Sequence, residues 1–111
     1  MATRKDRWHE DVISKKKDLY VHTAERCAKF LMENYKVKKI FLVGSLVRGV
    51  FHERSDIDLV VEGIPEKLYI KALTDLYDLL LPGMELNLIP FEDAFDTLKE
   101  ETLKKGRLLY G

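Results

Sequence analysis

The 111-residue sequence has few of the residues that cross-link a chain or bind metal ions. It holds one cysteine, Cys27, and three histidines, His9, His22 and His52. A single cysteine excludes an internal disulfide, and the histidines are too scattered along the sequence to give metal-ligand spacing. The sequence therefore excludes both a disulfide framework and a histidine-based zinc motif.

Net charge and long apolar runs are also lacking. The 19 basic and 19 acidic residues cancel, so there is no overall electrostatic reason to expect duplex nucleic acid as a partner. No apolar stretch approaches the ~20 residues of a membrane span, and the polar, basic N-terminus lacks the apolar centre of a signal peptide. We therefore expect a cytoplasmic protein with no membrane or duplex nucleic-acid partner.

What is present is the pattern of one small domain of mixed class. The length suffices for a single core but not for a catalytic domain plus a separate substrate-binding domain. Hydrophobic periodicity predicts helices over residues 8–35, 46–51, 65–81 and 92–105, and strands over 39–43, 55–61 and 84–89. This order predicts an α/β or α+β domain, with a small mixed sheet that has helices mainly on one face. The other face would carry acidic side chains.

The most informative motif is Gly44-Ser45 followed, after ten residues, by Asp56-Ile57-Asp58. The apolar run 39–43 reads as a buried strand that ends at Gly44, and a helix that starts just after Ser45 would direct unpaired N–H groups at an anion. On the next strand Asp56 and Asp58 share a face, about 6.5 Å apart along the strand. Phosphate and a divalent cation are the natural ligands of such a pair of elements.

Two carboxylates so close repel each other, which implies a raised pKa or a bound cation. Magnesium takes hard oxygen ligands, commonly one or two carboxylates plus substrate phosphates, and manganese suits the same ligands. Glu85 lies on the polar face of the predicted strand 84–89 and would complete a triad, as a metal ligand or as a base for an incoming hydroxyl. The alternatives are a pair of acids that decorates a strand end and a Glu85 that is only solvated.

Together these residues resemble a known family. The motif at residues 44–58, with Arg48-Gly49 and Ser55 inside the spacer and an acid on a later strand, is similar to the nucleotidyltransferase superfamily that includes DNA polymerase β. The short length and the segments 44–49 and 105–110 most resemble its minimal nucleotidyltransferases (MNT). The resemblance implies a single nucleotidyltransferase palm domain over residues 1–111, with a leading helix at 1–37 and the catalytic core at 38–111. Glu85 stands where many relatives carry Asp.

The resemblance also implies an activity, the Mg²⁺-dependent transfer of AMP from ATP to a hydroxyl with release of pyrophosphate, commonly with two metal ions. It implies nucleotide contacts from Gly44, Ser45 and Ser55, and metal and catalytic roles for Asp56, Asp58 and Glu85. To these we add Arg48 from its charge, as a residue that neutralises phosphate. The alternative for Arg48 is a surface salt bridge.

The partner implied by the resemblance is a helical HEPN-domain protein, because minimal nucleotidyltransferases commonly act as antitoxins of HEPN toxins and transfer AMP to a toxin tyrosine. Two alternatives stay open: transfer to a small hydroxylated molecule such as an aminoglycoside, and a non-catalytic antitoxin that binds its partner. A homodimer also stays open. The tail residues Leu108, Leu109 and Tyr110 are candidates for an apolar contact surface, or for core packing.

Overall fold

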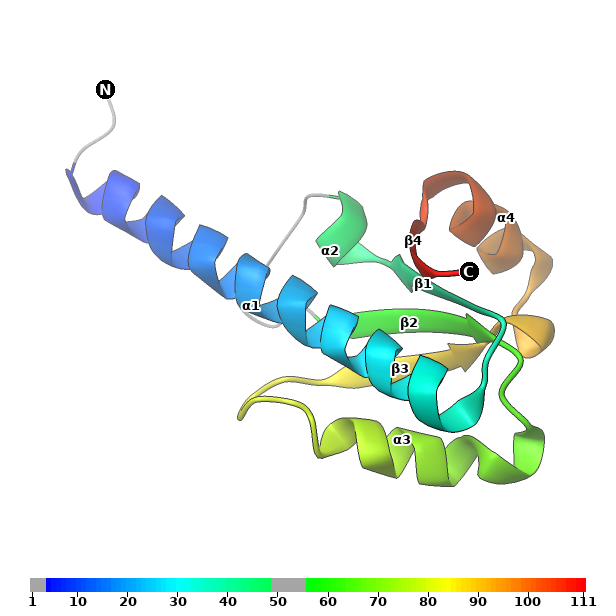
Figure 1. Ribbon diagram of the computed structural model, residues 1–111. Coiled ribbons are helices and arrows are strands. Elements are labelled where there is room, and N and C mark those ends of the chain that lie inside the picture. The colour runs from blue at the N-terminus through cyan, green and yellow to red at the C-terminus, as the bar shows by residue number, and fades with distance from the viewer. Residues whose placement is uncertain (1–3, 49–55) are drawn as a thin grey trace.

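Eight helices and strands build the described part of the protein (Figure 1). The computed structural model describes residues 4–48 and 56–111, with side chains from residue 15 onward. In chain order the elements are α1 (Arg4–Tyr35), β1 (Lys39–Val43), α2 (Ser45–Arg48), β2 (Ile57–Glu62), α3 (Tyr69–Tyr77), β3 (Leu86–Pro90), α4 (Asp96–Lys105) and β4 (Arg107–Tyr110). Short 3₁₀ turns at Glu66–Leu68 and Phe91–Asp93 precede α3 and α4.

The strands form one mixed four-stranded sheet in the order β3-β2-β1-β4. β1 runs antiparallel to both β2 and β4, whereas β2 and β3 run parallel. The predicted α+β class with a small mixed sheet is confirmed. Each predicted strand and helix is found at least in part. The helix predicted over 65–81 is shortened to a 3₁₀ turn and α3, and the one predicted over 92–105 begins only at Asp96. Residues 49–51 of the helix predicted over 46–51 lie outside the described residues.

β4 is an element that the periodicity does not predict. Residues 107–110 pair with β1 through the partners Leu108–Phe41 and Arg107–Leu42, a contact between segments far apart in the sequence. Leu109 packs against the main core, while Leu108 stays half exposed. Four residues carry too little alternation to mark a strand on their own, so only the long-range pairing reveals it.

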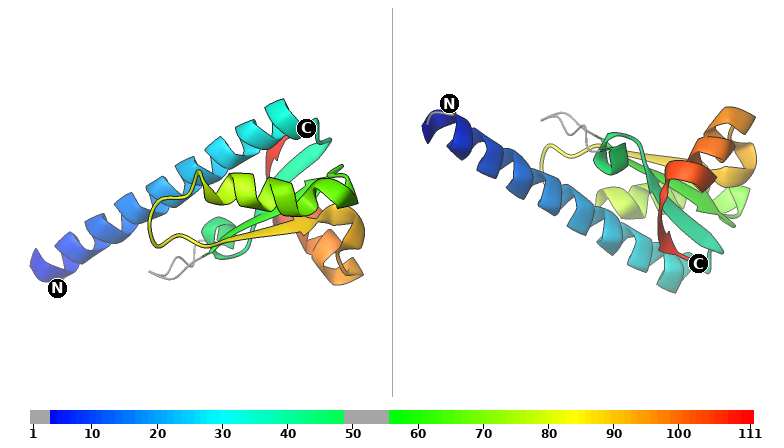
Figure 2. Two further views of the ribbon diagram at one scale, coloured as in Figure 1. Left: turned by 90° about the horizontal axis from the view of Figure 1, so that it is seen from below. Right: turned by 90° about the horizontal axis from the view of Figure 1, so that it is seen from above.

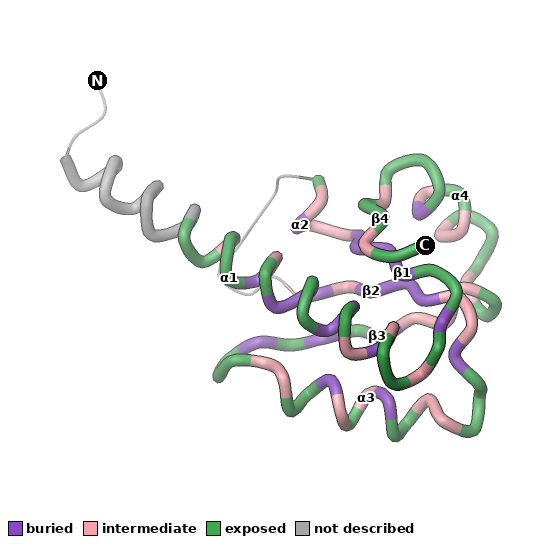
Figure 3. The backbone as a smooth tube through the Cα atoms, viewed as in Figure 1, coloured by how far each residue is buried: buried purple, intermediate pink, exposed green. Residues whose placement is uncertain are grey.

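The sheet separates two cores (Figures 2 and 3). The larger one lies between the sheet and the helices α1, α2 and α3, and its fully buried side chains include Leu31, Ile40, Leu42, Ile57, Leu59, Val61 and Leu76. The smaller one joins Phe41, Val43 and Val60 on the opposite face, where α4 contacts β1. Because side chains alternate along β2, Asp58 shares the face of Val60 and points away from α1 and α3.

The helix α1 packs by its C-terminal half and extends beyond the sheet at its N-terminal end (Figure 1). Tyr20, Ala24, Cys27 and Leu31 are buried, whereas Leu19 is half exposed. The hydroxyl of Tyr35 donates to Asp75 at 2.6 Å and so fastens the end of α1 to α3. Within residues 4–48 and 56–111, no helix has the length and apolarity to cross a membrane.

Burial of Cys27 generates a test of the main core. Its side chain is fully buried, and burial raises the pKa of the thiol from 9.0 to about 11. Between these values the thiol ionises only in the unfolded chain, so the free energy of unfolding falls as pH rises, by about 2–3 kcal/mol at most. We expect urea denaturation at pH 8 to 11 to show this loss in the wild type and a smaller loss in Cys27→Ala. Identical pH dependence of the two proteins would contradict the buried position of the thiol.

Candidate active site

The carboxylates of Asp56 and Asp58 converge on one amide group. Asp56 directly precedes β2 and Asp58 is its second residue, half-buried on the sheet face opposite α1 and α3. The side-chain nitrogen of Asn87 donates to Asp58 Oδ1 at 2.8 Å and to Asp56 Oδ2 at 3.3 Å. A group with two hydrogen-bond donors therefore bridges the acid pair that the sequence predicts.

The register between β2 and β3 decides which residue completes this cluster. The parallel pairing sets Ile57 beside Leu86 and Asp58 beside Asn87. Asn87 was missed from the sequence, although it lies on the same polar positions of the 84–89 strand as Glu85. The alternation of polar and apolar residues places both Asn87 and Glu85 on the polar face of the strand. The pairing register of β3 on β2 decides which of them lies beside Asp58, and a shift of two residues would exchange one for the other.

Glu85 lies just before β3 and is not brought to the acid pair. Its backbone oxygen accepts a hydrogen bond from the N–H of Ile57 at 2.9 Å. Its carboxylate accepts one from the hydroxyl of Tyr77, at the end of α3, at 3.1 Å. Within the described residues, no cluster of three or more Asp, Glu, His or Cys side chains is placed to hold a metal ion. A metal-binding or catalytic role for Glu85 stays a prediction.

Gly44 brings the backbone directly against the Asp58 carboxylate. It follows β1, where Val43 pairs with Asp58, and its φ of +83° is a conformation that L side chains rarely adopt. A Cβ at this position would overlap with Asp58 Oδ2. The Gly44 oxygen accepts hydrogen bonds from the N–H groups of Val47 and Arg48, which start the single turn of α2 after Ser45. Any other residue at this position would require the Asp58 carboxylate to move.

The surroundings of Asp58 disfavour its negative charge. Burial raises the pKa of its carboxyl above the usual value, and the nearby charge of Asp56 raises it further. The hydrogen bond from Asn87 and the positive charge of Arg48 act in the opposite direction. The pair is therefore a site of unbalanced negative charge, which a bound cation would relieve.

The donor set fits a divalent cation. The carboxylate oxygens are the hard ligands that Mg²⁺ prefers, and they already converge on a partly positive amide group. The residues that would hold the ion are Asp56 and Asp58.

Arg48 lies at the edge of this cluster. Its side chain is mostly exposed, and its guanidinium is 3.9 Å from the carboxylate of Glu101 on α4, a long ion pair that contributes little to stability. The predicted nucleotide contact Ser55, and His52 and Arg54 in the same spacer, lie outside the described residues.

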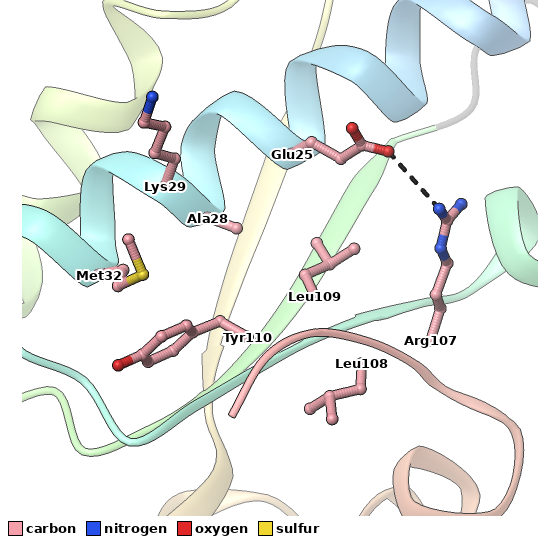
Figure 4. A pocket seen from close by; sticks show the side chains of 8 residues that line it. All are labelled: Glu25, Ala28, Lys29, Met32, Arg107, Leu108, Leu109 and Tyr110. Atoms are coloured by element: carbon pink, nitrogen blue, oxygen red, sulfur yellow. Dashed lines mark ion pairs between the residues drawn. The ribbon is translucent and has the colours of Figure 1, made fainter.

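Two of the hollows on the described surface lie away from the acid pair and are lined by side chains of several elements. A groove of about 410 Å³ runs between α1 and β4, where Glu25 and Arg107 form an ion pair of 3.6 Å and where Met32 and Tyr110 also contribute (Figure 4). A second hollow of about 480 Å³ is lined by apolar residues such as Ile64 and by Glu92. Neither is lined by the residues of the cluster at Asp58.

Comparison with known proteins identifies the family. The family model described as "Polymerase beta, Nucleotidyltransferase" matches residues 25–111, which is most of the chain. The chain belongs to this nucleotidyltransferase family. The family prediction made from the motif at residues 44–58 is thereby confirmed.

Two similar sequences come from Methanocaldococcus jannaschii. "Putative protein adenylyltransferase MJ0604" is 33% identical over 81 residues, which cover 68% of this chain and 80% of that protein. "Putative protein adenylyltransferase MJ1215" is 51% identical over 43 residues, which cover 39% of this chain and only 50% of that relative.

Solved structures share the fold. A chain of a toxin–antitoxin crystal structure with AMP-PNP has a TM-score of 0.65 at 24% identity, over 78% of this chain and 73% of that one. A chain of the toxin–antitoxin MntA-HepT has a TM-score of 0.60 at 22% identity, over 80% and 70%. These likenesses establish the nucleotidyltransferase fold of the present chain.

The contact between Gly44 and Asp58 gives a matched pair of variants. Gly44 and Gly83 both have positive φ, but a Cβ on Gly83 meets nothing within 4 Å. We expect Gly83→Ala to cost about 1–2 kcal/mol of unfolding free energy from φ alone, and Gly44→Ala to cost about 1–3 kcal/mol more, because Asp58 must move. Urea denaturation measures both. Equal losses in the two variants would show that Asp58 does not pack on Gly44.

Proposed function

We propose that this protein is a Mg²⁺-dependent nucleotidyltransferase that transfers AMP from ATP to a hydroxyl group. The observation that carries the proposal is the convergence of the Asp56 and Asp58 carboxylates on one point, directly beside the Gly44 turn. Membership of the nucleotidyltransferase family and relatives named for adenylyl transfer support it. Manganese would serve the same oxygen ligands.

In this reaction the acceptor hydroxyl loses its proton to solvent water and its oxygen forms a bond to the α-phosphorus of ATP, while the bond from that phosphorus to the bridging oxygen breaks and pyrophosphate leaves. Such a displacement needs positioning and charge neutralisation more than covalent help. Asp56 and Asp58 would hold Mg²⁺, which supplies charge stabilisation when bound. The backbone at Gly44 and Ser45 lies next to the pair and would contact the triphosphate.

Three further residues, Arg48, Ser55 and Glu85, are considered for the proposed site. Arg48 is close enough to influence the charge of Asp58, which supports a role in neutralising phosphate. Ser55 is proposed as a nucleotide contact from the family resemblance alone. A metal or catalytic role for Glu85 would require its carboxylate to leave the Tyr77 hydroxyl and turn to the acid pair.

For the acceptor, we propose a tyrosine of a HEPN-type partner toxin, with this chain as the antitoxin. Relatives are named as protein adenylyltransferases, and the fold is shared with chains of toxin–antitoxin structures. A second candidate, an antitoxin that acts by contact without transfer, is favoured by one observation. Within the described residues, no third acid is placed at the pair to take the proton of the acceptor hydroxyl.

Transfer of label from ATP separates these functions. We expect the protein, incubated with α-³²P-ATP, Mg²⁺ and the helical protein encoded beside it, to label that partner. The double variant Asp56→Asn/Asp58→Asn removes the metal ligands at nearly constant side-chain size, so labelling should fall at least about a hundredfold. The initial rate of labelling, followed by gel autoradiography, gives the comparison.

The matched control is Glu62→Gln/Glu66→Gln, which also neutralises two acids but away from the site, and it should label at the wild-type rate. Circular dichroism checks that both double variants are folded. If the wild type binds the partner tightly but transfers no label, the contact antitoxin replaces the enzyme. Equal labelling by wild type and the Asp56/Asp58 variant would exclude the acid pair as the active site.

A further inference from the structure

We propose that Asn87 is a positioning residue that holds Asp56 and Asp58 together in the metal-free protein, and that its amide makes cation binding at this site depend on bound nucleotide. This inference rests on the proposed function. It concerns the third position of the acid cluster, which the strand register gives to an amide instead of a carboxylate.

The first step of the argument is geometric. Asn87 lies directly beside Asp58 across the parallel strands, and its single side-chain nitrogen reaches both carboxylates, at 2.8 Å and 3.3 Å. An amide NH₂ has two protons, so it donates to both acids at once. The side chain therefore draws together two groups that would otherwise repel each other.

The second step concerns the charge of the cluster. Two carboxylates and a neutral amide give a formal charge of −2, whereas a third carboxylate would give −3. Mg²⁺ keeps much of its hydration and is commonly bound by one or two carboxylates together with substrate phosphates. With only two acids in place, the phosphates of the nucleotide become a needed part of the ligand set, so nucleotide and cation should bind with strong positive coupling.

The third step concerns competition inside the site. The protons of Asn87 point at the carboxylate oxygens that a cation would also approach. A cation must therefore displace at least part of this hydrogen bonding, or the amide must turn to present its oxygen. When the amide turns, its oxygen becomes available as a further ligand for an ion held by the two carboxylates that Asn87 keeps close together, so loss of this side chain weakens cation binding.

Substitutions at this position should change cation affinity in opposite directions. Asn87→Asp adds a third carboxylate, so Mn²⁺ alone should bind at least about tenfold more tightly than to the wild type. Asn87→Leu keeps the size but removes the clamp, so Mn²⁺ should bind several-fold more weakly, with or without nucleotide. If Asn87 only supported the fold, the two substitutions would not change the Mn²⁺ affinity in opposite directions.

The test is a titration of free Mn²⁺ by electron paramagnetic resonance, with and without α,β-methylene-ATP, which resists cleavage at the reacting bond. We expect the analogue to tighten Mn²⁺ binding to the wild type at least about tenfold, and to tighten binding to Asn87→Asp much less. The matched control is Glu62→Gln, which removes an acid at the other end of β2. Its Mn²⁺ affinity should equal that of the wild type.

Three outcomes would overturn the inference. One is an Asn87→Asp variant, folded by circular dichroism, that binds Mn²⁺ no more tightly than the wild type. Another is a loss of Mn²⁺ affinity in a further variant, Glu85→Gln, which would return the third position to Glu85. Both leave the proposed function standing, because the wild type still binds Mn²⁺ with the analogue. If the wild type binds neither Mn²⁺ nor α,β-methylene-ATP, the proposed function fails together with the inference.

Discussion

Repulsion between the carboxylates of Asp56 and Asp58 is the constraint around which the rest of the site is arranged. Asp58 lies on β2 and Asp56 directly before it, both carboxylates face the amide of Asn87, and Asp58 is partly withdrawn from water. Two features answer this unfavourable charge, the amide of Asn87 and the positive charge of Arg48, and the absence of a side chain at Gly44 leaves room for the Asp58 carboxylate. Asn87 comes from β3, Arg48 from α2, and Gly44 from the turn after β1. The site therefore exists only when these elements are assembled beside β2.

The two faces of the sheet have different roles: one is packed into the main core, and the other carries the acid pair. The alternation of β2 sends Ile57, Leu59 and Val61 into the core under α1 and α3, and sends Asp58 to the opposite face. The large core can therefore hold the strand rigidly while the acids stay open to a ligand. Rigid elements fix a site more accurately than loops do, which suits a reaction that depends on positioning.

Much of this arrangement is predictable from the sequence. The run 39–43, its end at Gly44 and the period-two spacing of Asp56 and Asp58 are local signals, and each is found as predicted. What could not be predicted depends on long-range pairing. The strand β4 is too short to stand out, and the choice of Asn87 over Glu85 follows from the register of β3 on β2, which no local pattern contains.

The central claim is that the acid pair is where metal and nucleotide meet. Anomalous diffraction from crystals grown with Mn²⁺ and α,β-methylene-ATP tests it most directly, because it locates the metal without reference to activity. The account predicts an anomalous peak in contact with carboxylate oxygens of both Asp56 and Asp58, with the triphosphate beside Gly44 and Ser45. A peak bound to Glu85 instead, or nucleotide bound away from the Gly44 turn with no metal at the pair, would contradict it.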